Sequence, residues 1–111
     1  MTMTAKRLAT GQVTASIASI YTAGASTKAV VKRASFCNTT SGAITLLVQH
    51  VPPAGSVSDG NMLINHVSIS AGETYVAGEL EGQVVEATGS IQAEASSAGS
   101  ITAIISGVEI T

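Results

Sequence analysis

Aromatic side chains and charge are both scarce in this chain of 111 residues. Only 3% of the residues are aromatic, there is no tryptophan, and 11% are charged, against roughly 25% in an average soluble domain. So few aromatic rings argue against a platform that stacks bases or sugar rings. A surface with so little charge is covered either by Ser and Thr or by partner proteins. The net charge of −2 argues against general nucleic-acid binding.

Cysteine is almost absent, and long hydrophobic runs are missing. The single cysteine, Cys37, excludes an intrachain disulfide, and its place in the apolar run AVVKRASFCN predicts a small buried side chain. No stretch approaches the ~20 apolar residues that a membrane span needs. Polar residues interrupt the apolar part of the N-terminal segment, so neither a signal peptide nor a membrane partner is predicted. We expect a protein that is made in the cytoplasm and carries no targeting signal.

Charge of each sign is absent from one part of the chain. No cation lies beyond Arg33, and no acid lies before Asp59. Two interpretations stay open. Basic early strands could pair with acidic late strands inside one domain, or a basic and an acidic patch could attract other copies or a scaffold. The cations are Lys6, Arg7, Lys28, Lys32 and Arg33, and the acids are Asp59, Glu73, Glu79, Glu81, Glu86, Glu94 and Glu109.

Strand signals recur along the whole chain. β-Branched residues dominate the apolar runs, Gly occurs 11 times, and turn residues separate the runs, a pattern typical of an antiparallel β-sandwich or barrel. The two strands that flank residues 38–42 are expected to form a hairpin, residues 52–61 the longest loop, and residues 71–72 a change of direction between sheets. About eight short strands are predicted, at residues 17–22, 28–37, 43–51, 61–70, 73–80, within 82–90, 90–96 and 101–110.

These strands belong to one small domain. Residues 1–12 lack periodicity and are predicted to be an N-terminal arm, whereas residues 13–111 form the all-β sandwich. Small side chains predominate and bury little apolar surface, which stabilises by about 25 cal/mol per Å². A single copy should therefore be marginally stable, and oligomerisation is a usual remedy.

Candidate catalytic and metal-binding groups are few. Glu73 follows Gly72 at the turn in VSISAGETY, where an acid is normally solvated, and no motif pairs it with a second carboxylate. His50 and His66 lie near the ends of consecutive predicted strands. With Asp59 they are considered as metal ligands, as a pH-sensitive pair or as ordinary strand-end residues. Their spacing fits no zinc motif. We predict a non-enzymatic protein with no catalytic residue, cofactor or metal.

Three segments follow one another in a distinctive order: IYTAGASTKAVVKRASFCNTTSGAITLLVQHVPPAGS, then NMLINHVSISAGETYVA, then VVEATGSIQAEASSAGSITAIISGVEIT. In that order, over residues 20–111, the chain resembles small structural proteins of tailed-bacteriophage virions. The shared features are a glycine-centred turn before a first strand, a CNTS-like hairpin, an AGET turn and a terminal VSGVEI-like strand. The chain departs from the group at residues 88–90, where an acidic EAGD-type turn is usual.

The resemblance implies a jelly-roll-like β-sandwich that is a structural part of the particle. The leading hypothesis is a capsid decoration (cement) protein on the virion surface, which forms a homotrimer and bridges subunits of the phage major capsid protein. A neck, tail or fibre-adaptor component is the alternative, and a carbohydrate-binding module is a further one. The residues predicted to contact partners are Lys6, Arg7, Leu8, Lys28, Lys32 and Arg33.

Overall fold

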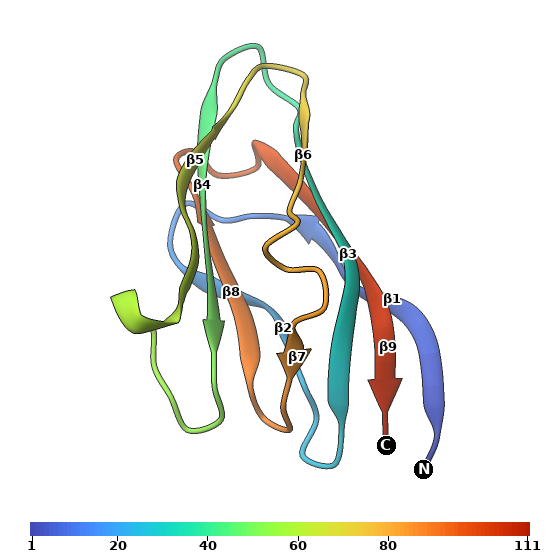
Figure 1. Cartoon of the computed structure of the whole chain (residues 1–111). Coiled ribbons are helices and arrows are strands. Elements are labelled where there is room, and N and C mark those ends of the chain that lie inside the picture. Colours follow the sequence, from blue (N-terminus) through green and yellow to red (C-terminus); the bar gives the residue numbers. More distant parts are fainter.

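The computed structural model describes all residues, 1–111, and its regular secondary structure is almost entirely β-strand. Two antiparallel sheets pack face to face (Figure 1), and the only helical element is the short 3₁₀ turn η1, Asp59–Asn61. The strands are β1 (Met3–Gln12), β2 (Ala18–Thr22), β3 (Lys28–Asn38), β4 (Ile44–Val51), β5 (Met62–Ile69), β6 (Thr74–Val76), β7 (Val84–Val85), β8 (Ser90–Ala95) and β9 (Ile101–Ile110).

The strand order is that of a jelly roll. Sheet A has the order β1-β9-β3-β6, with β7 also paired to β3, and sheet B has the order β2-β8-β4-β5. The pairs are nested along the chain: β1 with β9, β2 with β8, β3 with β6, and β4 with β5. Such nesting is produced when one long antiparallel ribbon is wrapped into two four-stranded sheets. The predicted antiparallel β-sandwich is therefore confirmed, and the eight predicted strands correspond to β2–β9.

The predicted N-terminal arm is wrong. Met3–Gln12 forms the edge strand β1, which pairs with β9 along its whole length, and the ends of the chain are joined by hydrogen bonds between Thr2 and Thr111. Figure 1 shows both termini side by side at one end of sheet A. The strand lacks a sequence pattern because only Leu8 of its ten residues is buried, and because a bulge between Arg7 and Ala9 shifts the alternation. The sandwich thus begins at residue 3, not 13.

The predicted hairpin around residues 38–42 is also wrong, because β3 lies in sheet A and β4 in sheet B. The loop between them crosses from one sheet to the other and is organised by Asn38, which is fully buried. The Asn38 amide donates to the carbonyl oxygens of Gly42 (2.8 Å) and Ile69 (2.9 Å), and its side-chain oxygen accepts from the backbone N–H of Thr40 (2.9 Å). The predicted change of sheet at residues 71–72 is confirmed, since β5 and β6 lie in different sheets.

The core between the sheets is aliphatic and contains a single phenylalanine, Phe36. A glycine in the middle of β9 allows the sheet to close tightly. A Cβ on Gly107 would overlap the carbonyl oxygen of Val30 and approach Cδ1 of Leu8 to 2.9 Å. Both neighbouring strands are bulged beside this glycine, β1 at Leu8 and β3 at Lys32. The bulges decide which side chains of β1 and β3 face outward.

Candidate functional site

The outer face of sheet A carries apolar side chains that have no place in the core. The register places Met3 and Ile110 in one row, and Val30 and Val108 in another, on the side opposite the buried rows of β9. Met3 is 62% exposed, and the β9 residues of these rows are half-buried. Large apolar side chains on the outside of a sheet commonly mark a contact surface. The apolar members are Met3, Ala5, Val30, Val76, Val84, Ile104, Val108 and Ile110.

Two arginines lie in the middle of this apolar surface. Arg7 of β1 and Arg33 of β3 both pair with Ser106 of β9, so the three residues form one row across sheet A. With strands about 4.8 Å apart, the two arginine Cα atoms are separated by roughly 10 Å. Both side chains are exposed, and neither has an ion-pair partner within the chain. Two guanidinium groups at this spacing can receive a pair of carboxylates from a partner.

Lys28 and Lys32 extend the positive charge along β3, and no acidic residue belongs to the outer rows of sheet A. We call this surface the basic-apolar face. It is defined by the apolar residues given above together with Arg7, Lys28, Lys32 and Arg33. Lys32 is exposed because the bulge in β3 places two consecutive residues, Lys32 and Arg33, on the surface. The alternation of the sequence alone would have placed them on opposite faces.

The outer face of sheet B has a different character. Its outward rows contain Ser19, Thr22, Gln92 and Glu94 from β2 and β8, and Thr45 from β4. Of the larger apolar residues in these rows, Leu47 and Val51 are buried and cannot contact a partner, and Met62 of β5 is half-buried. A polar sheet face is what a solvated surface requires. The two outer faces therefore differ in kind, and only that of sheet A has the composition of a contact surface.

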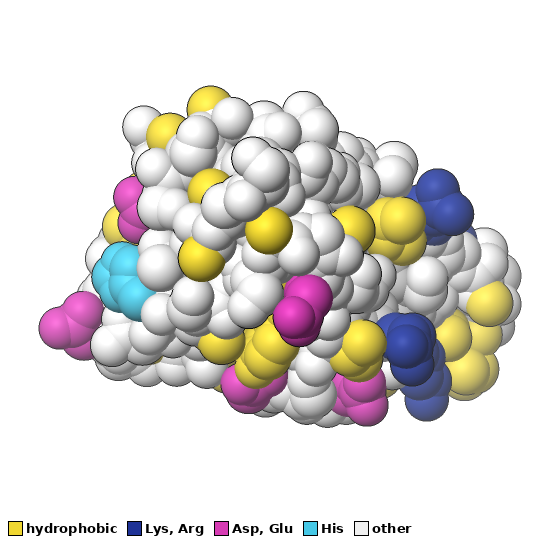
Figure 2. Space-filling model, turned by 90° about the horizontal axis from the view of Figure 1, so that it is seen from above, with side chains coloured by type: hydrophobic (Ala, Val, Ile, Leu, Met, Phe, Trp, Pro, Cys, Tyr) yellow, Lys and Arg dark blue, Asp and Glu magenta, His cyan; other side chains and the backbone are white.

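Positive and negative charges are separated over the molecule. Figure 2 shows the Lys and Arg side chains toward one end, with acidic side chains and a histidine on the rest of the visible face. Three acids lie within the connection from β6 to β7 and just beyond it. We call residues 77–86 the acidic segment, and its acids are Glu79, Glu81 and Glu86. All three are exposed, and none forms an ion pair.

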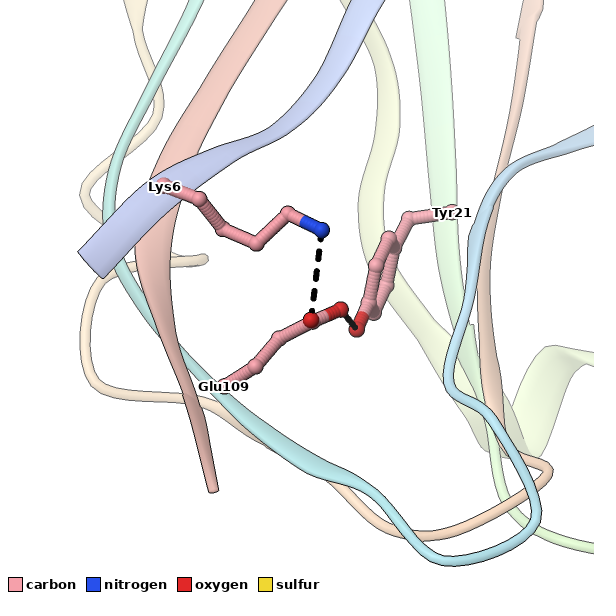
Figure 3. Close-up of polar contacts among 3 residues, drawn as sticks. All are labelled: Lys6, Tyr21 and Glu109. Carbon is pink, nitrogen blue, oxygen red and sulfur yellow. Dashed lines mark hydrogen bonds and ion pairs between the residues drawn. The ribbon is translucent and has the colours of Figure 1, made fainter. Parts of the chain in front are cut away.

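Lys6 is the one predicted contact cation that forms an ion pair within the chain. Its ammonium lies 3.2 Å from Oε1 of Glu109, and the Tyr21 hydroxyl donates to Oε2 of the same carboxylate at 2.6 Å. Figure 3 shows the three side chains converging from β1, β9 and β2. They join sheet A to sheet B at the edge of the sandwich. For this pair, the interpretation in which early cations meet late acids within one domain holds.

The electrostatics of this cluster follow from its geometry. The hydrogen bond from Tyr21, with the charge of Lys6 as a smaller contribution, holds the pKa of the Glu109 carboxyl below its ordinary value. Burial, together with the neighbouring carboxylate, raises the pKa of Tyr21 well above that of a free phenol. The tyrosine therefore remains a donor and the glutamate an acceptor over a wide pH range. The cluster is suited to holding two sheets together.

Leu8, also predicted as a contact residue, lies in the core instead. It is 9% exposed because the bulge in β1 turns it inward over Gly107. Cys37 shows the opposite change. It was expected in the core, but it is half-buried on the outer face of sheet A, in a row with Thr74 and Thr102, while Phe36 points inward. Alternation along β3 after the bulge accounts for this position.

The two histidines do not share a site. His50, near the end of β4, lines a hollow of about 310 Å³ beside the loop of residues 52–61, together with Glu86. His66 lies at a bulge of β5 with a φ of 59°, is exposed, and lines a separate hollow. No group of three His, Cys, Asp or Glu side chains could hold a metal ion. The predicted grouping of His50, His66 and Asp59 is therefore not formed.

Glu73 lies at the turn between β5 and β6, with its side chain exposed and without a hydrogen bond from another side chain. Its backbone carbonyl accepts from the N–H of Asn38 (2.9 Å). The neighbouring Tyr75 donates to Glu79 at 2.6 Å, and this bond raises the pKa of Tyr75 to about 12. These contacts account for the turn and the short strand that follows it.

Comparisons with known proteins add a fold neighbour only. No protein-family model and no curated protein matches the chain. A solved structure titled "Structure of infectious bursal disease virus Gx strain" is similar over 97% of this chain, with a TM-score of 0.47 and 11% identity. This chain spans 31% of that neighbour's length. No helix of the chain has the length and hydropathy to cross a bilayer.

Proposed function

We propose that the chain is a non-enzymatic structural subunit of a tailed-bacteriophage virion, and specifically a capsid decoration protein. The single observation that carries the proposal is the basic-apolar face, because a surface with exposed Met3, half-buried Ile110 and unpaired Arg7 and Arg33 suits contact with protein better than contact with water. The sequence resemblance to small virion proteins points to the same role. The jelly roll agrees with it as a fold-level analogy, since viral capsid domains are among its users.

The size of the face is adequate for this role. Three strands of about ten residues and one short edge strand cover roughly 20 by 30 Å, or about 600 Å². A stable interface buries about 800 Å² on each partner. One such face supports a moderate contact, and a decoration protein gains its effect from many moderate contacts repeated over a shell.

The shell contact is assigned to the end of sheet A where both chain termini lie. Met1 is 95% exposed there, and Met3, Ile110 and Lys28 form the last row of the face. This replaces the free arm as the element that touches major capsid subunits. The bond between Thr2 and Thr111 fixes the two termini together, so the contact surface is ordered before binding.

The proposal is tested by locating the protein in purified particles. Virions from a phage that encodes the chain are analysed by quantitative mass spectrometry and cryo-electron microscopy. A copy number comparable to that of the major capsid protein, with density over the shell lattice, is the expected result. A few copies at a single vertex would instead establish the neck, tail or fibre-adaptor alternative. Absence of the chain from particles would overturn the structural role altogether.

The assigned contact is tested with the purified protein and undecorated shells. Met3→Asp should reduce the fraction that sediments with shells, because it introduces a negative charge into an apolar row. Ser68→Asp, on the outward side of β5 in sheet B, adds the same charge elsewhere and should bind as the unaltered chain does. Equal binding by both variants would exclude the terminal end of sheet A as the shell contact.

A further inference from the structure

The arginine row of the basic-apolar face lacks an acidic partner inside the chain. Arg7 and Arg33 flank Ser106 at the centre of the face, and the only ion pair in the molecule is that between Lys6 and Glu109. Exposed cations surrounded by half-buried apolar residues gain most from a partner that brings carboxylates together with apolar surface. The question is which molecule supplies the carboxylates.

The chain itself presents such carboxylates on the acidic segment. Leu80 anchors the segment, since it is fully buried between the exposed Glu79 and Glu81. Backbone hydrogen bonds from Gly82 to Val31 (2.7 Å) and from Val31 to Gln83 (3.0 Å) fix it along the outer edge of β3. The carboxylates are therefore held on a rigid support, and little conformational entropy is lost when they are bound.

The acidic segment and Arg7 belong to the same sheet but cannot meet within one molecule, and Arg33, on β3 beside the segment, forms no ion pair with it. The segment lies at the β6 and β7 edge of sheet A, whereas Arg7 lies on β1 at the opposite edge. Val84, which is 44% exposed and lies within the segment, supplies an apolar contact beside the acids. A second copy can therefore place its β6–β7 edge, with acids and valine together, on the basic-apolar face of the first.

We propose that the basic-apolar face of one copy binds the acidic segment of the next copy, with Arg7 and Arg33 receiving Glu81 and Glu86. Because the two surfaces differ, the contact is heterologous, and repeated use of it produces a closed ring or an open chain. A homotrimer is the smallest ring of this kind. The proposal deepens the proposed function, on which it rests for the expectation that copies meet, and it names the surfaces through which they do so.

The test uses charge reversal and rescue. Arg7→Glu with Arg33→Glu reverses the face, and Glu81→Lys with Glu86→Lys reverses the segment. Each double reversal should weaken self-association by roughly tenfold or more, read as a fall in mass by light scattering across a dilution series. All four changes in one chain restore opposite charges at every contact and should return the mass to that of the unaltered protein. Circular dichroism confirms that each variant is folded.

A matched control and the contrary outcomes complete the design. Glu94→Lys reverses an acid on the outer face of sheet B and should leave the mass unchanged. The proposal is overturned if the unaltered chain stays monomeric at every concentration, if neither reversal changes the mass, or if the fourfold variant remains dissociated. Shell binding is read separately. Monomers that decorate shells would overturn this contact between copies but leave the proposed function standing. Oligomers that never bind shells would support this contact but overturn the proposed function.

Discussion

Replacing Tyr21 with Phe removes one hydrogen bond that joins sheet A to sheet B. The hydroxyl donates to Glu109 at 2.6 Å, and Tyr21 is only 8% exposed. A hydrogen bond to a charged group contributes about 1.5–3 kcal/mol. Glu109 retains Lys6 and is 21% exposed, so water can replace part of the lost bond. We therefore expect a loss of about 1–2 kcal/mol, which corresponds to a fall in Tm of roughly 5–10 °C for a domain of this size.

Tyr75→Phe is the matched control. The Tyr75 hydroxyl also donates to a carboxylate at 2.6 Å, but the acceptor is Glu79, four residues away, and the contact is exposed. It joins no separate elements and is screened by water, so its removal should cost no more than about 0.5 kcal/mol. Thermal unfolding of both variants, followed by circular dichroism at pH 7, compares the same atom deletion in two settings.

The pH dependence of the Tyr21→Phe effect gives a second readout. The folded-state pKa of Glu109 is lowered. Its contribution to the free energy of unfolding is therefore complete above the unfolded-state pKa of about 4.3 and is lost as pH falls through the folded-state pKa. The folded-state pKa of Tyr21 is raised. Its contribution to the free energy of unfolding is therefore complete below the unfolded-state pKa of about 10 and is lost as pH rises through the folded-state pKa. The difference in stability between the two chains should thus be largest between roughly pH 5 and 10.

A double-mutant cycle with Glu109→Gln isolates the interaction. If the two side chains act together, the loss in the double variant is smaller than the sum of the two single losses. Additive losses, or a Tyr21→Phe loss no larger than that of Tyr75→Phe, would refute the idea that this bond fastens the sheets. A difference in stability that persists unchanged at acid pH would refute the assigned role of the ionised carboxylate.

Three further predictions probe the fold, two by substitution and one by the reactivity of a native side chain. Gly107→Ala should lower the Tm by 10 °C or more, which corresponds to roughly 2–3 kcal/mol of overpacking, because the added Cβ would overlap the Val30 carbonyl. Gly42→Ala is the control and should change the Tm little, because no atom lies within 4 Å of the added Cβ. Equal Tm values for the two variants would contradict the close packing at Gly107. Asn38→Ala should cost about 2–4 kcal/mol in urea unfolding, since it leaves buried backbone groups unpaired, and an unchanged midpoint would show that the loop does not depend on this side chain. Cys37 should react with a thiol reagent in the native protein, whereas protection until unfolding would place it in the core.

Alternation of apolar and polar residues predicted most of this fold. The runs that became β8 and β9 are regular because both neighbours in the sheet and the opposite sheet enforce one buried face. β1 was not predictable in the same way. As an edge strand it buries only Leu8, and a bulge interrupts its phase, so the residues that make it a strand are those of β9, far along the chain.

Bulges also explain why the basic-apolar face could not be derived from the sequence. Composition and the distribution of charge indicated a basic patch, but not which cations would share it. Lys6 and Arg7 are adjacent, yet Lys6 pairs with Glu109 while Arg7 joins Arg33 beside Ser106. Arg7 and Arg33 share this row only because the bulge at Lys32 shifts β3 by one residue relative to β9.

The two interpretations of the charge distribution are therefore not exclusive. The internal interpretation accounts for a single pair, Lys6 with Glu109, which lies where the two sheets meet. If the early cations served only to pair with late acids in the same sandwich, the β9 residue opposite Arg33 would be an acid. The residue opposite Arg33 is instead Ser106. The sheet could have placed an acid at that position without cost to the core, since the side chain points outward. A serine between two arginines leaves their charge free for a carboxylate from outside, and the acidic segment of a second copy is the partner that we propose for them.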